Sequence, residues 1–406
     1  MSTSALTNRN FLIYIGGSLF SLHGVWVYRV ALAWLAWQLT FSEFWVGVIA
    51  FTQFAPTVVL GPAFGVLADR FDRRLAGALV NAGSVINMLV LAWLASQSTI
   101  DIAALVILSA IQGTLDGAYS PLRMAIVPTL VRDEQRSSAI ALGSVAFNLS
   151  RFVGPALAGL IIARWGVGPA FAFNGVSYVG VIVALALIRL ETTGRKDRPA
   201  KHPWLELKEG ARYLFTHDFL RLLLLFGAVQ CVLGRGSLEM LPAFADAVYE
   251  GGATALAALT SAIGAGAILG GIILSRGTHW LTMGVLRIGL MIAGGFVVLL
   301  GIVDTLPRAM ATVAILGLLL SLCGVGSQIL MQTHVDDDYR GRVSSFWSAT
   351  IFGGTALGSL LIGAVASAWD LQYSVIAAGA LITVMIGLAG RLPTAAKRAD
   401  GQGPEH

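Results

Sequence analysis

Long apolar segments alternate with short polar ones along almost the whole chain. Typical segments are 46–67, 75–94, 253–274 and 309–330, and none of them carries a charged side chain. As α-helices, segments of about 20 apolar residues match the thickness of the hydrocarbon core of a bilayer. The pattern therefore predicts twelve membrane-spanning helices, over 11–38, 45–68, 75–96, 102–123, 139–163, 169–190, 219–241, 253–274, 282–303, 308–330, 341–367 and 372–390.

The composition excludes an ordinary soluble fold. Hydrophobic residues make up 56% of the 406 positions and charged residues only 12%, whereas soluble domains carry about 25% charged residues. The 47 glycines fit a membrane protein, because small residues let membrane helices approach closely. The first apolar segment, 11–39, is too long for a cleavable signal peptide, so we expect it to be the first span. Cys231 and Cys323 fall inside predicted spans and are expected to be free, buried thiols.

Positive charges are distributed unequally between the two sets of loops. Little more than Arg164 and Arg308 falls on one side. The other side carries Arg9, Arg70, Arg73, Arg74, Arg132, Arg136, the cluster 195–208, Arg212, Arg276, Arg340, Arg342, Lys397 and Arg398. Cytoplasmic loops are enriched in Lys and Arg, so we expect this second side, with both termini, in the cytoplasm of a bacterial inner membrane protein. The net charge of +5 follows from this bias and does not indicate nucleic-acid binding.

A polar stretch over 191–208 separates six predicted spans from the next six. The segment WLELKEGARYLFT that follows alternates charged and apolar residues with helical period. It predicts an amphipathic helix that either lies on the cytoplasmic membrane surface or forms a solvated linker. The expected organisation is an N-terminal six-helix bundle over 1–190, a cytoplasmic linker over 191–218, and a C-terminal six-helix bundle with a short tail over 219–406.

The two halves are related in sequence. VRDEQRSSAIAL at 131–142 aligns with VDDDYRGRVSSF at 335–346, an offset of 204 residues that also places Gly154 on Gly358. Internal repeats in a membrane chain are typical of transporters whose substrate site lies between two related halves, near the midplane. We therefore predict an all-α membrane protein of two pseudo-symmetric six-helix bundles.

The loop GVLADRFDRR at 65–74 resembles the G-x-x-x-D-R-x-G-R-R signature of the major facilitator superfamily. Asp72 stands where the family usually has glycine, and the matching residues are Gly65, Asp69, Arg70, Arg73 and Arg74. RVALAWLAWQLT, SPLRMAIVPTLVRDEQ, RFVGPALAGLI and YRGRVSSFWSATIFGGTALGSLLIG are similar to the bacterial subgroup of enterobactin-type siderophore exporters and related drug exporters. The resemblance runs from about residue 10 to residue 391 and implies the major facilitator fold.

The resemblance implies a gating role for this loop. Gly65 would let the second span approach a neighbouring helix, and the Asp69 carboxylate would face the positive N-terminus of the eleventh span when the protein is open outward. Arg70 and Arg73 belong to the same gating motif, with a topology signal alone as the alternative for the arginines. Ser275 replaces the aspartate in the second half, so the contact there is expected to be weaker or absent.

An ionisable side chain inside a span is costly unless it faces protein or water, so each one is a candidate functional residue. Asp116 and Tyr119 share a helical face of the fourth span, and Asn148 and Arg151 share one of the fifth. We expect these spans to be neighbours. An Asp116–Arg151 pair is therefore predicted as a substrate site or proton-linked switch, with a static ion pair between helices as the alternative.

Further candidates for the substrate or proton site lie in the first and seventh spans. Arg235 and Glu239 are four residues apart and would pair within their own helix, as an outer gate or as a structural pair. Arg29 has no evident partner. His23 can titrate near neutral pH or can serve as a hydrogen-bonded packing residue.

RFVGPALAGL at 151–160 resembles the antiporter motif of the superfamily's fifth span. Gly154, Pro155 and Gly159 would permit a kink and close packing, and the resemblance implies export. The arginine usual in the fourth span is Ser109 here, so proton coupling would use another group, first of all Asp116. Aromatic and amide residues that would line a cavity are Trp34, Trp37, Phe147, Asn174, Tyr178, Gln328 and Trp347.

These features predict a secondary transporter that exports a small amphipathic drug or siderophore by alternating access, coupled to protons. The alternatives are a lipid or lysolipid translocator with little ion coupling and, more distantly, a substrate-sensing receptor. The sequence has no phosphate-binding loop, no H-E-x-x-H motif and no His/Asp cluster in the predicted spans, so we expect no enzyme, metal or cofactor. The expected partners are membrane lipids, the small-molecule substrate and protons, without nucleic acid, and the chain is expected to be a monomer.

An even number of spans makes a direct prediction about the two ends of the chain. Cysteines placed at Arg9 and at His406 should react with a membrane-impermeant maleimide from the same face, and a cysteine at Arg308 from the opposite face. Labelling of intact cells and of inverted vesicles measures this. Reaction of the two ends from opposite faces would contradict the predicted topology.

Overall fold

The described chain is almost entirely helical. The computed structural model describes residues 5–68, 71–188, 203–336 and 339–389, and no strand occurs within these ranges. Twelve helical segments of this part are long and apolar enough to cross a bilayer. The predicted all-α membrane fold is therefore confirmed.

The first half of the chain forms six long helices. They are α1 (Arg9–Thr40), α2 (Glu43–Ala68), α3 (Arg73–Ser96), α4 (Ile102–Ile126), α5 (Arg136–Trp165) and α6 (Val167–Leu187). The last five spans of the second half are α11 (Gly252–Ser275), α12 (Met283–Ile302), α13 (Leu306–His334), α14 (Arg340–Ala368) and α15 (Leu371–Ala389). These eleven helices agree with the predicted spans to within a few residues at most ends.

The seventh span is built differently. It was predicted to end at residue 241 but continues to Val248. Its parts are α8 (Asp218–Val229), the π-helical turn η4 (Gln230–Arg235), α9 (Gly236–Leu238), α10 (Leu241–Ala243) and the π-helical turn η5 (Phe244–Val248). Wide π-helical turns are often found at functional sites, and the first of them ends at Arg235.

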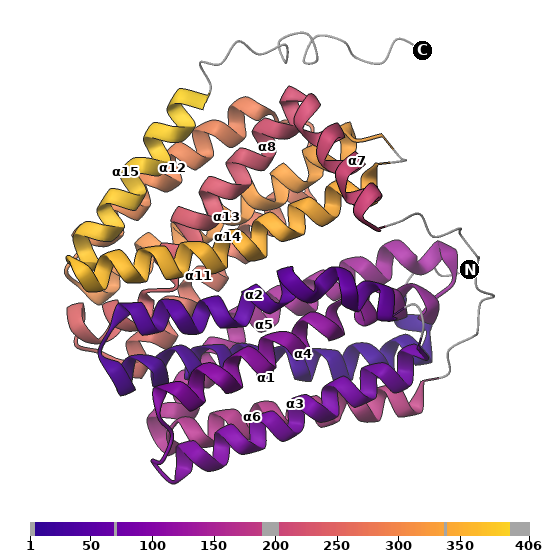
Figure 1. Ribbon diagram of the computed structural model, residues 1–406, viewed down its shortest axis with the longest axis horizontal. Coiled ribbons are helices and arrows are strands. Elements are labelled where there is room, and N and C mark those ends of the chain that lie inside the picture. The colour runs from indigo at the N-terminus through magenta and orange to yellow at the C-terminus, as the bar shows by residue number, and fades with distance from the viewer. Residues whose placement is uncertain (1–4, 69–70, 189–202, 337–338, 390–406) are drawn as a thin grey trace.

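The two halves form two bundles that lie one above the other in Figure 1, with the first half in indigo to magenta and the second in red to yellow. At the boundary, α2 packs against α14 and α5 against α11, while α3 pairs with α6 and α12 with α15 away from the boundary. This equivalence of contacts is what the internal repeat predicts.

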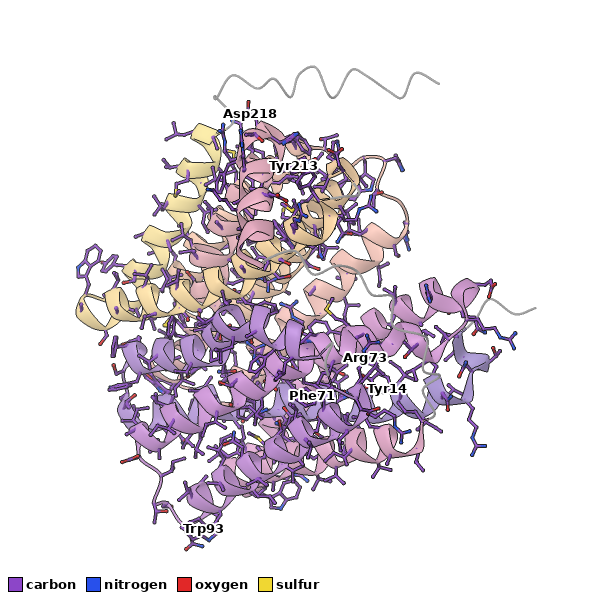
Figure 2. All side chains as sticks on the ribbon, turned by 45° about the vertical axis from the view of Figure 1, so that its right-hand side comes forward. Tyr14, Phe71, Arg73, Trp93, Tyr213 and Asp218 are labelled. Carbon is purple, nitrogen blue, oxygen red and sulfur yellow. The ribbon has the colours of Figure 1, made fainter. Side chains whose placement is uncertain are left out.

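The helix ends define two faces of the protein. We call one the arginine-rich face, because α1, α3, α5 and α14 begin there with Arg9, Arg73, Arg136 and Arg340. We call the other the arginine-poor face. Figure 2 shows Tyr14 and Arg73 towards one end of the first bundle and Trp93 at the other.

The bundles are joined near the arginine-poor face. Trp37 at the end of α1 donates a hydrogen bond from Nε1 to Oδ2 of Asp246, at 2.8 Å. The hydroxyl oxygens of Ser42 and Ser367 lie 3.4 Å apart. These polar contacts connect the first bundle to η5 and to the end of α14.

Two glycines allow the helices to touch at this boundary. A Cβ atom on Gly159 of α5 would overlap the Cβ of Ala257 in α11. The equivalent position in the second half is Gly363 of α14, where a Cβ would overlap the carbonyl oxygen of Glu43 in α2. Larger residues at either position would push the bundles apart.

The preceding glycine of the motif packs within each bundle. A Cβ on Gly154 would overlap the Trp26 side chain, so this glycine brings α5 against α1. In the second half, a Cβ on Gly358 would overlap the carbonyl oxygen of Val232, so α14 lies against the seventh span. Each member of the repeat thus meets the equivalent neighbour.

The predicted linker helix is α7 (Pro203–Thr216), which packs on the start of α14. Nη1 of Arg342 lies 3.0 Å from Oε2 of Glu209. The ring of Tyr213 stacks on that of Tyr339, with centroids 4.1 Å apart. Figure 2 shows Tyr213 on the second bundle. The described part of the linker is therefore anchored to the C-terminal half.

The contact at Gly159 predicts the effect of a larger side chain. Gly159→Leu should destabilise the closed arginine-poor face by about 1–3 kcal/mol because it overpacks the boundary, which lowers the ratio of closed to open protein roughly 5- to 150-fold. The measurement is disulfide formation between cysteines placed at Ser42 and Ser367. The control is Gly271→Leu, where no atom lies within 4 Å of the added Cβ; equal crosslinking in both variants would contradict the prediction.

Candidate substrate cavity

A cavity of about 820 Å³ lies between the two bundles. Its volume is in the range of pockets that hold drug-sized molecules. Tyr14, Met124 and Ile140 line it towards the arginine-rich face, and Met124 is 73% exposed there. At the other end, the contacts near the arginine-poor face close it. In the described part of the chain, the cavity is therefore exposed towards the arginine-rich face and closed by contacts towards the arginine-poor face.

The charged residues of the cavity wall are unequal in sign. Its lining contains one carboxylate, Glu239, and four guanidinium groups, from Arg29, Arg123, Arg151 and Arg235. Within the part of the chain that the structure describes, these arginines form no ion pair. Within the described residues, the wall therefore carries more positive than negative charge.

Two of these arginines make cation–π contacts with aromatic rings. The guanidinium of Arg29 lies 5.1 Å from the centre of the Trp26 ring and 4.6 Å from that of Phe54. The guanidinium of Arg151 lies 5.8 Å from the same Trp26 ring. These cation–π contacts stabilise the cations without cancelling their charge, so both remain available to an anion.

The predicted pair between Arg235 and Glu239 is wrong, because their charged groups are not within ion-pair distance. The prediction assumed a regular α-helix, but η4 ends at Arg235 and the helical geometry changes there. Both side chains instead line the cavity, and Nε of Arg235 is buried without a hydrogen-bond partner. The Glu239 carboxylate lies in the electrostatic field of Arg235, Arg29 and Arg151.

The predicted pair between Asp116 and Arg151 is also wrong. We expected the fourth and fifth spans to be neighbours, but α4 packs against α2 and α3, while α5 packs against α1 and α11. Arg151 therefore points into the cavity, and Asp116 does not line it.

Asp116 instead belongs to a polar network inside the first bundle. Its Oδ1 accepts hydrogen bonds from Nε2 of Gln112, at 2.9 Å, and from the Tyr178 hydroxyl, at 3.3 Å. Asn87 donates to Oε1 of Gln112 at 3.1 Å, and the Ser84 hydroxyl oxygen lies 3.3 Å from Nε2 of Gln112. The network joins α3, α4 and α6, and no pattern in the sequence indicated that Asn87 and Gln112 belong to it.

Two other candidates serve as packing residues. Nδ1 of His23 lies 2.7 Å from the Leu19 carbonyl oxygen and 3.1 Å from Oγ of Ser150, outside the cavity lining. The Tyr119 hydroxyl lies 3.2 Å from that of Tyr14, which does line the cavity. Neither His23 nor Tyr119 contacts Asp116 through a hydrogen bond.

Part of the predicted gating motif lies outside the described residues. This applies to Asp69 and Arg70, and to the side chain of Asn148 among the site candidates. Arg73 begins α3. No atom lies within 4 Å of a Cβ built on Gly65. The close approach of the second span to a neighbouring helix was predicted for an outward-open state, so it stays a prediction.

Arg74 has a clear structural contact. Its Nε donates to the Leu185 carbonyl oxygen at 2.9 Å and its Nη2 to that of Ala186 at 3.0 Å. In the second half, Arg287 donates to the Gly387 carbonyl oxygen at 3.0 Å. Both arginines bind the last carbonyls of a terminal helix of their bundle, where a cation is favourable.

Most of the aromatic and amide residues that were predicted to line the cavity lie elsewhere in the structure. Of the seven residues named from the sequence, only Phe147 lines the cavity. Trp34, Trp37, Asn174, Tyr178 and Trp347 are buried between helices, and Gln328 is exposed elsewhere. Three rings that do line the wall were not predicted from the sequence: Trp26, Phe54 and Phe352.

The internal repeat contained a signal for these positions. Arg235 follows Arg29 by 206 residues, the offset that relates Gly65 to Gly271. Both arginines line the cavity from the first span of their half. A search for charged residues at equivalent positions would have brought these two together.

The sequence profile of a family described as transmembrane secretion effectors matches residues 2–404. The chain belongs to this family of the major facilitator superfamily. The predicted family resemblance and fold are confirmed, and the protein is a transporter of the major facilitator type.

Several characterised proteins are similar along most of their length. The staphyloferrin A transporter of Staphylococcus aureus is 21% identical over 391 residues, which cover 95% of each chain. The enterobactin exporter EntS of Escherichia coli is 26% identical over 337 residues, 79% of this chain and 78% of that protein. Relatives of this kind and the twelve apolar helices of the described residues support a transporter that is a multi-pass protein of the bacterial inner membrane.

Solved structures share the fold. A bacterial homologue of the human lysosomal transporter Spinster, in an inward-facing and unoccupied conformation, superposes with a TM-score of 0.73 at 17% identity and covers 98% of both chains. A peptide transporter of the POT type gives a TM-score of 0.74 at 13% identity, over 94% of this chain and 93% of the other.

The Asp116 network predicts a stability effect. Asp116→Leu removes the acceptor of the Tyr178 hydroxyl and one of the acceptors of the Gln112 amide, at a cost of about 1–3 kcal/mol, whereas Asp116→Asn keeps an acceptor oxygen and should cost less. The measurement is the thermal unfolding midpoint of the purified protein in detergent. Ile111→Ala, at an exposed position of the same helix, is the control, and a wild-type midpoint for Asp116→Leu would show that the network is dispensable.

Proposed function

We propose that this protein exports a small amphipathic organic molecule, a siderophore or a drug, from the bacterial cytoplasm by alternating access. The observation that carries the proposal is the single-sided cavity between the two bundles. With the arginine-rich face in the cytoplasm, as the positive-inside rule indicates, the cavity is open inward and receives cargo from inside the cell. Rocking of the bundles then opens the other side.

The direction and the class of cargo are supported by two observations. The fifth-span segment with Gly154, Pro155 and Gly159 resembles a motif associated with export. The similar proteins of S. aureus and E. coli are named for the transport of staphyloferrin A and the export of enterobactin. An outward transporter of such a molecule fits both.

We assign the coupling of export to proton entry to Asp116. This carboxyl group lies within a span, where an ionisable residue is a functional candidate by default. Its hydrogen-bond partners are the uncharged Gln112 and Tyr178, and within the described residues it forms no ion pair with a cation. Binding of a proton to Oδ1 would replace acceptance by donation and rearrange the contacts between α4 and α6.

The gating motif completes the cycle. In the outward-open state, the Asp69 carboxylate would bind at the N-terminus of α14 and hold the cytoplasmic side closed. In the structure, α7 occupies part of that region through the Glu209–Arg342 contact. The opening and closing of the inner side would then depend on which partner the start of α14 has.

Transport in inverted vesicles tests the proposal. An acidic lumen should drive uptake of a cargo such as enterobactin into vesicles with the wild-type protein, and Asp116→Asn should reduce uptake to its level without a gradient. Arg164→Gln, an exposed residue at the end of α5, is the matched control. Full gradient-driven uptake by Asp116→Asn would remove Asp116 from coupling, and lysolipid flipping that ignores the gradient would favour a lipid translocator instead.

A further inference from the structure

The cavity has a feature that bears on the chemistry of the cargo, provided that the proposed function holds. Three of its arginines line the same cavity as one carboxylate: Arg29 on α1, Arg151 on α5 and Arg235 on η4 share this wall with Glu239. In the described part of the chain, none of the three has an ion-pair partner within 4.0 Å. Guanidinium groups in such a wall favour an anionic ligand.

We propose that the cargo is a polyanion: an amphipathic molecule whose two or more anionic groups, such as carboxylates, are bound by Arg29, Arg151 and Arg235. A guanidinium presents several N–H donors in a planar fork that matches a carboxylate. The buried Nε of Arg235, which has no hydrogen-bond partner among the described residues, is one donor that such a group would satisfy.

The three arginines come from both bundles. Arg29 and Arg151 belong to the first bundle and lie against one ring, that of Trp26, whereas Arg235 belongs to the second. Several anionic groups on one ligand would give the arginines of each bundle a partner. A polyanion bridges the bundles, which is the contact that alternating access requires around its cargo.

Apolar rings next to the arginines bind the rest of the molecule. The rings of Phe54 on α2 and Phe352 on α14 lie 6.2 Å apart across the boundary, and Phe147 lines the same cavity. An aromatic or aliphatic body that packs against these rings would be removed from water. The wall is therefore suited to an amphipathic anion and less to a fully hydrated one.

Glu239 is the resident anion of the site. In the empty cavity its carboxylate lowers the positive potential of the three guanidinium groups, and an arriving polyanion must compete with it. Removal of this charge therefore strengthens anion binding, whereas removal of any of the three arginines weakens it. These opposite effects give the proposal a distinctive signature.

Binding to the full-length protein in phosphatidylcholine nanodiscs tests the proposal. The probes are the trianion 8-methoxypyrene-1,3,6-trisulfonate and the cation ethidium, which are both planar aromatics, and fluorescence anisotropy is corrected with empty nanodiscs. The wild-type protein should bind the trianion more tightly than ethidium. Arg29→Gln, Arg151→Gln and Arg235→Gln should each weaken trianion binding about tenfold or more.

Matched variants separate charge from folding. Glu239→Gln should tighten trianion binding, a gain that a misfolded protein does not produce, and Arg235→Lys should bind better than Arg235→Gln. Arg308→Gln, whose parent side chain is 70% exposed far from the cavity, should bind as the wild type does. Preference of the wild type for ethidium, or wild-type trianion binding by all three arginine-to-glutamine variants, would overturn the proposal.

The outcome is distinguishable from failure of the proposed function. Gradient-driven export of a cation, with no binding of the trianion, would retain the exporter and remove the polyanion. Arginine-dependent binding of the trianion, without outward transport of any cargo, would retain the anion site and remove the exporter.

Discussion

The close packing of α2 on α14 and of α5 on α11 is the constraint on which the rest of this structure depends. Gly363 and Gly159 let these helices meet at the arginine-poor end, and membrane helices gain stability mainly from such packing, because lipid offers no hydrophobic drive for association. Since the helices meet there, the cavity between them opens at the other end. The position of Arg29, Arg151 and Arg235 around one space is a consequence of this arrangement.

The sequence predicts the features that depend on a local residue pattern. It does not predict the features that depend on which helices are neighbours in the fold. Twelve spans follow from runs of apolar residues, and the repeat predicts equivalent roles for Gly159 and Gly363. The partner of Asp116 depends on which helices are adjacent, and α4 does not border α5 as expected. The pairing of Glu239 failed because η4 interrupts regular α-helix, a change that no residue pattern marks. The aromatic rings of the cavity were missed because nothing in the sequence distinguishes an aromatic residue that lines a cavity from one that packs between helices.

The halves are equivalent in fold but not in chemistry. Arg29 and Arg235 occupy equivalent positions, yet Glu239 corresponds to Ala33 and Arg151 to Thr355, and all of these line the cavity. A proton on Glu239 would make the wall more positive and would strengthen the binding of an anion. Exchange of an anion against protons therefore needs a proton-binding group other than Glu239. Asp116, in the first bundle and outside the cavity, is such a group.

In the proposed cycle, the excess of arginines in the described cavity wall would also make the empty carrier sensitive to membrane voltage. Moving one elementary charge across 100 mV changes the energy by about 2.3 kcal/mol. An unloaded cavity with excess positive charge is favoured at the negative, cytoplasmic potential, whereas a cavity neutralised by its cargo is almost indifferent to the field. The resting potential of the cell would then act on the reset step, by returning the unloaded transporter to the side where it is filled.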